Sequence, residues 1–163
     1  MRDSVRWFVV AAVVIIADQL SKWLITERFS LSEMYPVTDF FNLVLVYNQG
    51  AAFSLLADAG GWQRPFFIAL GLITTLGISY FLRQHPHQPR ICWGLSLIMG
   101  GALGNVTDRV YLGHVIDFID IYFNQWHWPA FNVADIAIVL GALLLVLDGF
   151  LVTAPTESKS SSL

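Results

Sequence analysis

The chain has few charged residues for its length. Only 13% of its 163 residues are Asp, Glu, Lys or Arg, whereas soluble domains carry about 25%. At the same time 56% of the residues are hydrophobic, which is more apolar surface than a soluble fold of this size can bury. We therefore expect a protein that uses the lipid bilayer as the solvent for much of its surface.

Two further scarcities exclude other classes of protein. The net charge of −3 is small and spread along the chain, which argues against a nucleic-acid partner. The single cysteine, Cys92, excludes an internal disulfide and a cysteine-rich metal site. His114 and His127 with Asp117 could form another metal site, but they are better interpreted as loop residues. We expect neither a metal nor a cofactor.

Four apolar stretches approach the ~20 residues that a helix needs to cross a bilayer. They cover residues 7–25, 66–82, 91–106 and 133–152, approximately. The predicted fold is an all-α integral membrane protein with four transmembrane helices in one domain, 1–163, ending in a disordered tail, 153–163. A cleaved N-terminal signal peptide is the alternative for the first stretch. Against it, apolar residues resume beyond Asp18, at 23–25.

One connection between these stretches favours β-structure. Residues 37–47 are rich in β-branched and aromatic residues, and Asn48-Gln49-Gly50 follows as a turn signal. We expect one or two short strands here on the membrane surface, forming a small extracytoplasmic subdomain. The other long connection, 107–132, is interpreted as a loop.

Basic residues in the connections indicate the orientation in the membrane. If both termini are cytoplasmic, the inner side carries Arg2, Arg6, Arg83, Arg90 and Lys159. The outer side then carries Lys22, Arg28, Arg64 and Arg109. The excess of basic residues on the inner side becomes larger if Lys22 and Arg109 belong to a site and are left out of the comparison. Both long connections then face outward.

Ionisable groups at membrane depth are costly and therefore mark functional sites. Here they gather at the expected outer ends of the helices: Asp18, Lys22, Asp108, Arg109, Asp117, Asp120 and Asp135. Most have a structural explanation as well. Asp18 and Lys22 can form an i,i+4 pair, Asp108 can pair with Arg109, and Asp135 can form a capping box with Asn132. Asp117 lies between Ile116 and Phe118, where burial would raise its pKa.

Two carboxylates in unlike surroundings are suited to hydrolysis of an amide. The ionised one takes a proton from water, and the protonated one donates to the carbonyl oxygen or the leaving amine. Asp120 is the nearest rival of Asp117 for such a role. Serine and cysteine nucleophiles fit poorly, because Cys92 lies at the inner face and Ser21 and Lys22 point apart on a helix.

Four segments, in this order, resemble motifs of the lipoprotein signal peptidases, also called type II signal peptidases. They are Asp-Gln-Leu-Ser-Lys at 18–22, Asn-Gln-Gly-Ala-Ala-Phe-Ser at 48–54, Gly-Gly-Ala-Leu-Gly-Asn-Val-Thr-Asp-Arg at 100–109 with Gly-His-Val-Ile-Asp-Phe at 113–118, and Phe-Asn-Val-Ala-Asp at 131–135. The length of the chain and its hydropathy profile match this family too.

The resemblance implies an aspartic endopeptidase of the bacterial inner membrane with its site at the periplasmic face. Its partners would be membrane lipids and prolipoproteins, cleaved before a cysteine that carries a diacylglyceryl group, and we expect a monomer. The implied catalytic pair is Asp117 and Asp135, with Asp108 and Asp135 as the alternative pair. The positions expected to orient the substrate or the pair are Asp18, Lys22, Asn48, Asn105, Asp108, Arg109 and Asn132.

Two other classes of function remain to be separated from this one. A small transporter or a proton or ion pathway would use Asp18, Asp108 and Asp135 as a relay, and its acids would be staggered through the membrane. A structural membrane subunit would depend on no single acid.

Overall fold

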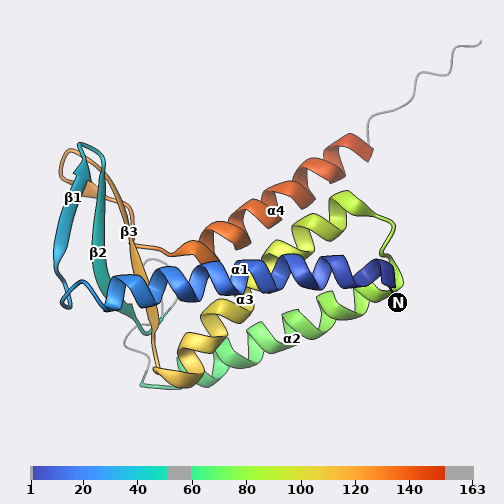
Figure 1. The fold of residues 1–163 in the computed structure, drawn as a ribbon, viewed down its shortest axis with the longest axis horizontal. Coiled ribbons are helices and arrows are strands. Elements are labelled where there is room, and N and C mark those ends of the chain that lie inside the picture. Colours follow the sequence, from blue (N-terminus) through green and yellow to red (C-terminus); the bar gives the residue numbers. More distant parts are fainter. Residues whose placement is uncertain (1, 51–59, 153–163) are drawn as a thin grey trace, which may run out of the picture.

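The computed structural model describes residues 2–50 and 60–152. Within them, α1 (Arg2–Thr26), α2 (Gln63–Gln84), α3 (Pro89–Tyr111) and α4 (Val133–Val152) make up most of the fold. A small antiparallel sheet lies beyond one end of the helices (Figure 1). The expectation of a mainly helical protein with a small β-containing subdomain is confirmed. The predicted tail, 153–163, lies outside the described residues.

Three of these helices, α1, α2 and α4, are long and apolar enough to cross a membrane. They expose large apolar side chains such as Val13, Leu76 and Leu147, which are 59%, 70% and 57% exposed. Apolar surface on this scale is unfavourable in water and is typical of contact with lipid. The protein therefore lies in a membrane.

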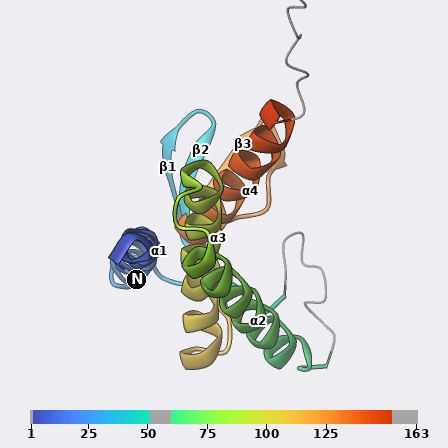
Figure 2. The same ribbon diagram turned by 90° about the vertical axis from the view of Figure 1, so that its right-hand side faces the viewer.

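Helix α3 occupies the centre of the helical layer. It contacts α1, α2 and α4, and Figure 2 shows it between them. Glycines allow this close packing, because a Cβ at Gly100 would lie 2.8 Å from the carbonyl oxygen of Ala11 in α1. A Cβ at Gly101 would clash with the carbonyl oxygen of Ala134 in α4. Small residues thus bring three helix backbones together near the polar end of α3.

The sheet has the strand order β1 (Met34–Thr38), β2 (Phe41–Asn48), β3 (Val115–Phe123) and β4 (Trp126–His127). The prediction of a strand within 37–47 is confirmed by β2, whereas β1, which pairs with it, begins earlier and overlaps that segment only at 37–38. The interpretation of 107–132 as a loop is wrong, because α3 continues to Tyr111 and β3 follows it. A β-bulge disturbs the alternation of β3: the amides of Phe118 and Ile119 both donate to the carbonyl oxygen of Phe131, at 3.0 and 2.8 Å.

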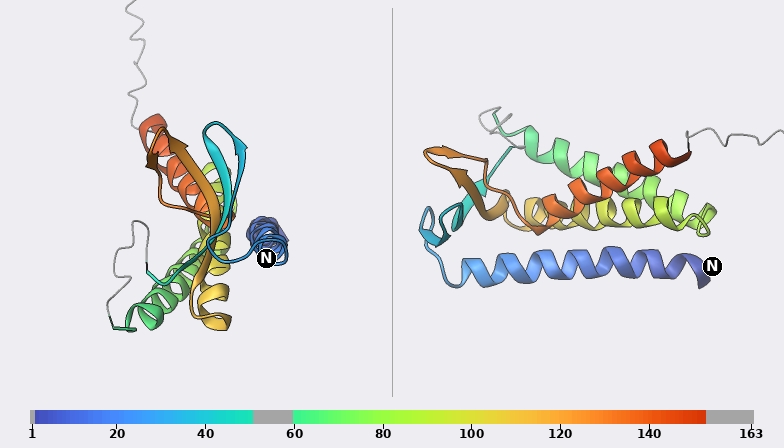
Figure 3. Two further views of the ribbon diagram at one scale, coloured as in Figure 1. Left: turned by 90° about the vertical axis from the view of Figure 1, so that its left-hand side faces the viewer. Right: turned by 90° about the horizontal axis from the view of Figure 1, so that it is seen from above.

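An apolar core fixes the sheet to the helices. Ile25 at the end of α1 packs with Leu45 of β2 and with Ile116 and Phe118 of β3, and all four are buried. Figure 3 shows that the sheet lies at the opposite end of the helices from the N-terminus. The start of β3 and the start of α4 consequently meet where α1 and α3 end.

Candidate active site

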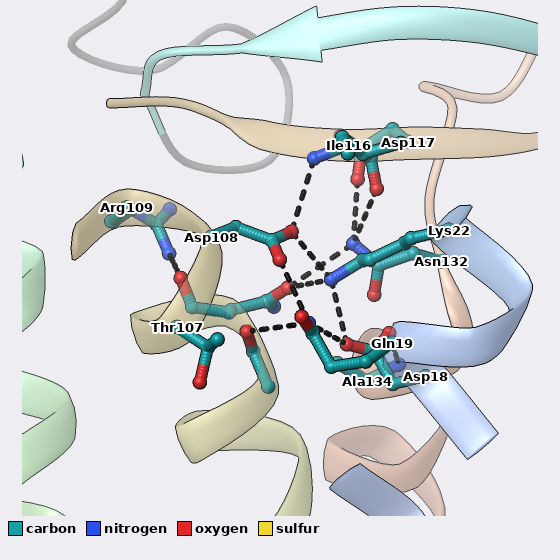
Figure 4. Close-up of polar contacts among 12 residues, drawn as sticks. Asp18, Gln19, Lys22, Thr107, Asp108, Arg109, Ile116, Asp117, Asn132 and Ala134 are labelled. Carbon is teal, nitrogen blue, oxygen red and sulfur yellow. Dashed lines mark hydrogen bonds and ion pairs between the residues drawn. The ribbon is translucent and has the colours of Figure 1, made fainter. Parts of the chain in front are cut away.

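A buried lysine connects two helices at this meeting point. Lys22 is 1% exposed, and its Nζ lies 2.8 Å from Asp18 Oδ2 and 2.7 Å from Asp108 Oδ2. It also donates to Asn105 Oδ1 at 3.0 Å. Figure 4 shows these side chains converging from α1 and α3. The structure thus contains the predicted i,i+4 pair and extends it to a second carboxylate.

The partner of Asp108 differs from the expected one. Asp108 accepts hydrogen bonds from Gln19 Nε2 at 2.8 Å and from the amide of Ile116 at 3.2 Å, besides its contact with Lys22. The expected pairing with Arg109 is wrong, because consecutive side chains on a helix point in different directions. Gln19 lies inside the first motif, but nothing in the sequence predicts its role.

Arg109 contacts the segment that follows β2. Its guanidinium donates to the carbonyl oxygens of Gly50 at 2.9 Å and Asn105 at 3.3 Å, and lies 4.8 Å from the centre of the Phe67 ring. Arg109 therefore connects the end of α3 to the chain that follows β2. The end of α3 is also bound from α2, since Arg64 donates to the carbonyl oxygen of Arg109 at 2.8 Å.

Two acids fix the first turn of α4. The amide of Asp135 donates to Asn132 Oδ1 at 2.9 Å, and the amide of Asn132 donates to Asp135 Oδ2 at 3.2 Å. This reciprocal arrangement is the predicted capping box. From α1, Asp18 Oδ1 accepts from the amide of Ala134 at 2.9 Å. Free amides at a helix N-terminus favour negative charge, so both carboxylates stabilise this end of α4.

Asp117 projects from the start of β3 and is 2% exposed. Its Oδ1 accepts from Asn132 Nδ2 at 2.7 Å, and its Oδ2 accepts from Asn48 Nδ2 on the neighbouring strand at 2.9 Å. Burial raises the pKa of Asp117 to about 7, and the nearby Asp135 raises it too, whereas the two amide donors act in the opposite direction. The carboxyl group therefore changes its protonation state near neutral pH.

Asparagine amides link Asp117 to Asp135. Asn105 Nδ2 donates to Asp135 Oδ1 at 2.8 Å, and Asn132 Nδ2 lies within hydrogen-bond distance of both Asn105 Oδ1 and Asp117 Oδ1, at 3.2 and 2.7 Å. Residues from β2, α3 and the segment before α4 therefore hold the two carboxylates through neutral donors. Such donors orient carboxylates without adding another charge.

Both carboxylates face one cavity of about 630 Å³. Its polar wall includes Asn48, Asn105 and Arg109 beside Asp117 and Asp135. The remaining wall is largely apolar and is made of Gly50, Val115, Trp128, Pro129, Ala130, Phe131, Ile136, Ile138, Val139 and Leu140. Part of that wall is the side of α4 that runs into the membrane. The arrangement can hold an apolar chain beside two acids.

The other candidates from the sequence have different surroundings. Asp108 does not line this cavity, and its carboxylate is held by Lys22, which disfavours the alternative pair. His114 stacks on Tyr47, with ring centres 4.0 Å apart. Across the described ranges, 2–50 and 60–152, no group of three His, Cys, Asp or Glu side chains is arranged to hold a metal ion.

Apolar helices together with a buried carboxylate pair define a membrane protein with a site suited to acid–base chemistry. The family model described as signal peptidase (SPase) II matches residues 10–151. A lipoprotein signal peptidase of Cupriavidus pinatubonensis is 57% identical over 142 residues, covering 87% of this chain and 81% of the relative. One from Janthinobacterium sp. is 54% identical, with 87% and 86% covered. The chain therefore belongs to the signal peptidase II family.

Solved structures agree with this assignment. One, described as a bacterial membrane enzyme at 2.3 Å resolution, superposes with a TM-score of 0.83 and 29% identity, covering 96% of this chain and 94% of the other. A second, at 1.9 Å resolution, gives 0.77 and 29%, with 92% and 94% covered. The similarity extends over the sheet as well as the helices, since nearly the whole chain is included.

Proposed function

We propose that this protein is a membrane-embedded aspartic endopeptidase that removes signal peptides from prolipoproteins. The bond cleaved is the one before a cysteine that carries a diacylglyceryl group. Asp117 and Asp135 are the catalytic pair. The observation that carries this proposal is that two carboxylates from separate elements line one cavity, and that the pKa of Asp117 is raised to about 7 by burial.

The chemistry requires one proton on the pair. The ionised carboxylate removes a proton from water as the water oxygen attacks the peptide carbonyl carbon, and the protonated carboxyl group donates to the carbonyl oxygen. A proton then passes to the peptide nitrogen, the C–N bond breaks, and the signal peptide leaves with a new carboxyl group. Asn48, Asn105 and Asn132 hold the carboxylates in position throughout.

The lining of the cavity supports a lipid-modified substrate. Ile138, Val139 and Leu140 form an apolar wall on α4, beginning about one turn after Asp135. An apolar signal helix and acyl chains can enter from the bilayer along this wall, and the scissile bond then stays level with the acids. Because the bond is held at the depth of the two acids, the reaction becomes nearly intramolecular, which lowers the entropic cost of bringing the bond and the acids together.

We further propose that all four helices span the bacterial inner membrane, with both termini in the cytoplasm. Helix α3 is less apolar than the others, but the neighbouring helices cover much of it, so its composition is compatible with spanning. Arg6, Arg83 and Arg90 lie at the ends far from the sheet, as expected for the cytoplasmic side. The active site then lies at the periplasmic face.

The position of the acids disfavours the transporter alternative. Asp18, Asp108 and Asp135 meet at one end of the helices and are connected to one another through Lys22, Asn105 and backbone amides. A relay across the membrane needs groups at successive depths.

Cleavage of a lipid-modified precursor by the purified protein in detergent tests the proposal. Asp117→Asn and Asp135→Asn should each lower kcat by at least about 1,000-fold, since removing one member of a catalytic unit abolishes most of its effect. Asp148→Asn, at the opposite end of α4 and paired with Arg90 at 3.8 Å, is the matched control and should cleave normally. Normal turnover by either active-site variant would end the proposal.

A further inference from the structure

A second hollow lies next to the active-site cavity and has no part in the chemistry described above. It has a volume of about 490 Å³ and is lined on the sheet by Met34, Val44, Val46, Asp120 and His127. We call it the sheet pocket. It shares the segment Trp128, Pro129 and Ala130 with the active-site cavity. The two spaces are therefore neighbours on either side of that segment.

The β-bulge in β3 explains why both spaces open on one side of the sheet. Asp117 and Asp120 are three residues apart, which in a regular strand places their side chains on opposite faces. Phe118 and Ile119 both lie opposite Phe131 and both pack into the core on the other side of the sheet, so the alternation shifts by one and both carboxylates face the segment 128–130. Because of this bulge, Asp120 belongs to the same surface as the catalytic pair.

Asp120 and His127 form a paired group in the sheet pocket. His127 Nδ1 lies 2.9 Å from both carboxylate oxygens of Asp120, and Asn42 donates to Asp120 Oδ2 at 2.7 Å. The ring of His127 stacks on Tyr122 with centres 5.1 Å apart. The side chain of Asp120 is 7% exposed and that of His127 is 43% exposed. The sheet pocket thus contains a buried, hydrogen-bonded carboxylate and a partly exposed imidazole next to the apolar side chains of Met34, Val44 and Val46.

We propose that the sheet pocket binds the first residues of the mature polypeptide, directly after the lipid-modified cysteine. Asp120 gives it a preference for a cationic or hydrogen-bond-donating side chain over an acidic one. This inference rests on the proposed function and extends it to the part of the substrate beyond the scissile bond. Asp120 and His127 are then specificity residues, and neither takes part in the cleavage chemistry.

The direction of the bound chain follows from the two walls of the catalytic cavity. The apolar signal peptide lies along α4, whose residues Ile138 and Leu140 line the cavity toward the bilayer. The chain on the other side of the scissile bond must continue away from the helices. Asp120 lies three residues further along β3 than Asp117, opposite Asn42 near the start of β2. The mature segment therefore passes over the segment 128–130 into the sheet pocket.

Competition between matched precursors tests the inference. The probes are synthetic precursors with a diacylglyceryl cysteine that differ only in the second residue after the cleaved bond, which is Lys, Ser or Asp. Wild-type protein should prefer Lys over Asp by roughly tenfold in kcat/KM, the combined effect of one partly exposed attraction and one repulsion. The ratio is independent of the fraction of protein that is folded.

Two variants should move this ratio in opposite directions. Asp120→Asn removes the charge and should bring the Lys-to-Asp ratio to within about twofold of unity. His127→Gln removes the group that contacts both oxygens of Asp120 and should raise the ratio above the wild-type value. His127 is partly exposed, so this variant gives an answer even if Asp120→Asn does not fold. His114→Gln, which makes the same change at a histidine outside the pocket lining, should leave the ratio unchanged.

The outcomes separate this inference from the function on which it rests. No cleavage of any precursor by wild-type protein would contradict the proposed function itself. Cleavage of all three at equal rates would refute the sheet pocket as a specificity site and leave the peptidase intact. The sheet pocket is likewise refuted if Asp120→Asn keeps the wild-type Lys-to-Asp ratio of kcat/KM. It is also refuted if His127→Gln and His114→Gln give the same ratio.

Discussion

Replacement of Lys22 by methionine is the sharpest test of the charge arrangement behind the proposed active site. The ammonium group is almost fully buried, and both Asp18 and Asp108 lie within 2.8 Å of it. The two carboxylates and the lysine together carry a formal charge of −1, and the substitution changes this to −2 with no solvent to screen it. Breaking a buried pair in this way costs about 3–5 kcal/mol of unfolding free energy.

A double variant separates charge from packing. Lys22→Met with Asp108→Asn returns the formal charge of the group to −1, so part of the lost stability should come back. Coupling between directly contacting groups amounts to about 0.5–3 kcal/mol. We therefore expect the double variant to be more stable than the sum of the two single changes predicts, by an amount in this range.

Equilibrium unfolding in mixed micelles, followed by tryptophan fluorescence, measures these differences. Arg28→Met removes a positive charge from an exposed position just after α1 and serves as the matched control, with an expected change below about 0.5 kcal/mol. The reasoning is refuted if Lys22→Met and Arg28→Met are equally stable, or if the effects of Lys22→Met and Asp108→Asn add without coupling.

Three further predictions concern the proposed catalytic pair and the packing of the helices beside it. The pKa of Asp117 is raised from 3.8 to about 7 in the folded protein, so its contribution to stability is lost as pH rises toward 7. Asp117→Asn should gain stability relative to wild type as the pH rises from about 4 to about 7, by at most about 4 kcal/mol. Asn105→Ala removes the donor to Asp135 at 2.8 Å and should lower kcat about tenfold to hundredfold, with KM little changed. Gly101→Ala should destabilise by about 1–3 kcal/mol because its Cβ clashes with α4, whereas Gly77→Ala has nothing within 4 Å and should not.

Each of these predictions has an outcome that contradicts it. A stability difference between Asp117→Asn and wild type that is flat with pH would mean that the carboxyl group titrates in its ordinary range. Equal kcat for Asn105→Ala and wild type would show that Asp135 does not depend on that amide. Equal stability of the two glycine variants would show that α3 and α4 can separate at no cost.

Local pairs are predictable from the sequence because they depend on helix geometry alone. The Asp18–Lys22 spacing and the Asn132–Asp135 capping box both follow from residues three or four apart, and both are present. The hairpin within 34–48 is partly predictable for a similar reason, since β-branched and aromatic residues are concentrated there.

Contacts between segments that are distant in the sequence cannot be predicted from local spacing and composition. Strand β3 is as rich in β-branched and aromatic residues as the hairpin, but its alternation of apolar and polar residues breaks at Phe118–Ile119, so its register does not follow from the sequence. The bonds from Gln19 to Asp108 and from Asn48 to Asp117 join residues 89 and 69 positions apart. Motif resemblance draws attention to most of these residues, but only the fold gives their partners.

The buried charged side chains contact the backbone next to both Asp117 and Asp135. Asp18 accepts from the amide of Ala134, the residue directly before Asp135, and Asp108 accepts from the amide of Ile116, the residue directly before Asp117. Lys22 contacts both acceptors and thereby joins them.

The backbone on the N-terminal side of each proposed catalytic acid is thus held by one member of the same ion network. A buried ion pair contributes little net stability compared with well-packed apolar residues, and we propose that this network instead fixes the relative positions of Asp117 and Asp135. Lys22→Met should then lower kcat even in the fraction that remains folded. An apolar replacement for all three charged groups should restore stability without restoring turnover, because packing alone does not align the two carboxylates across the cavity.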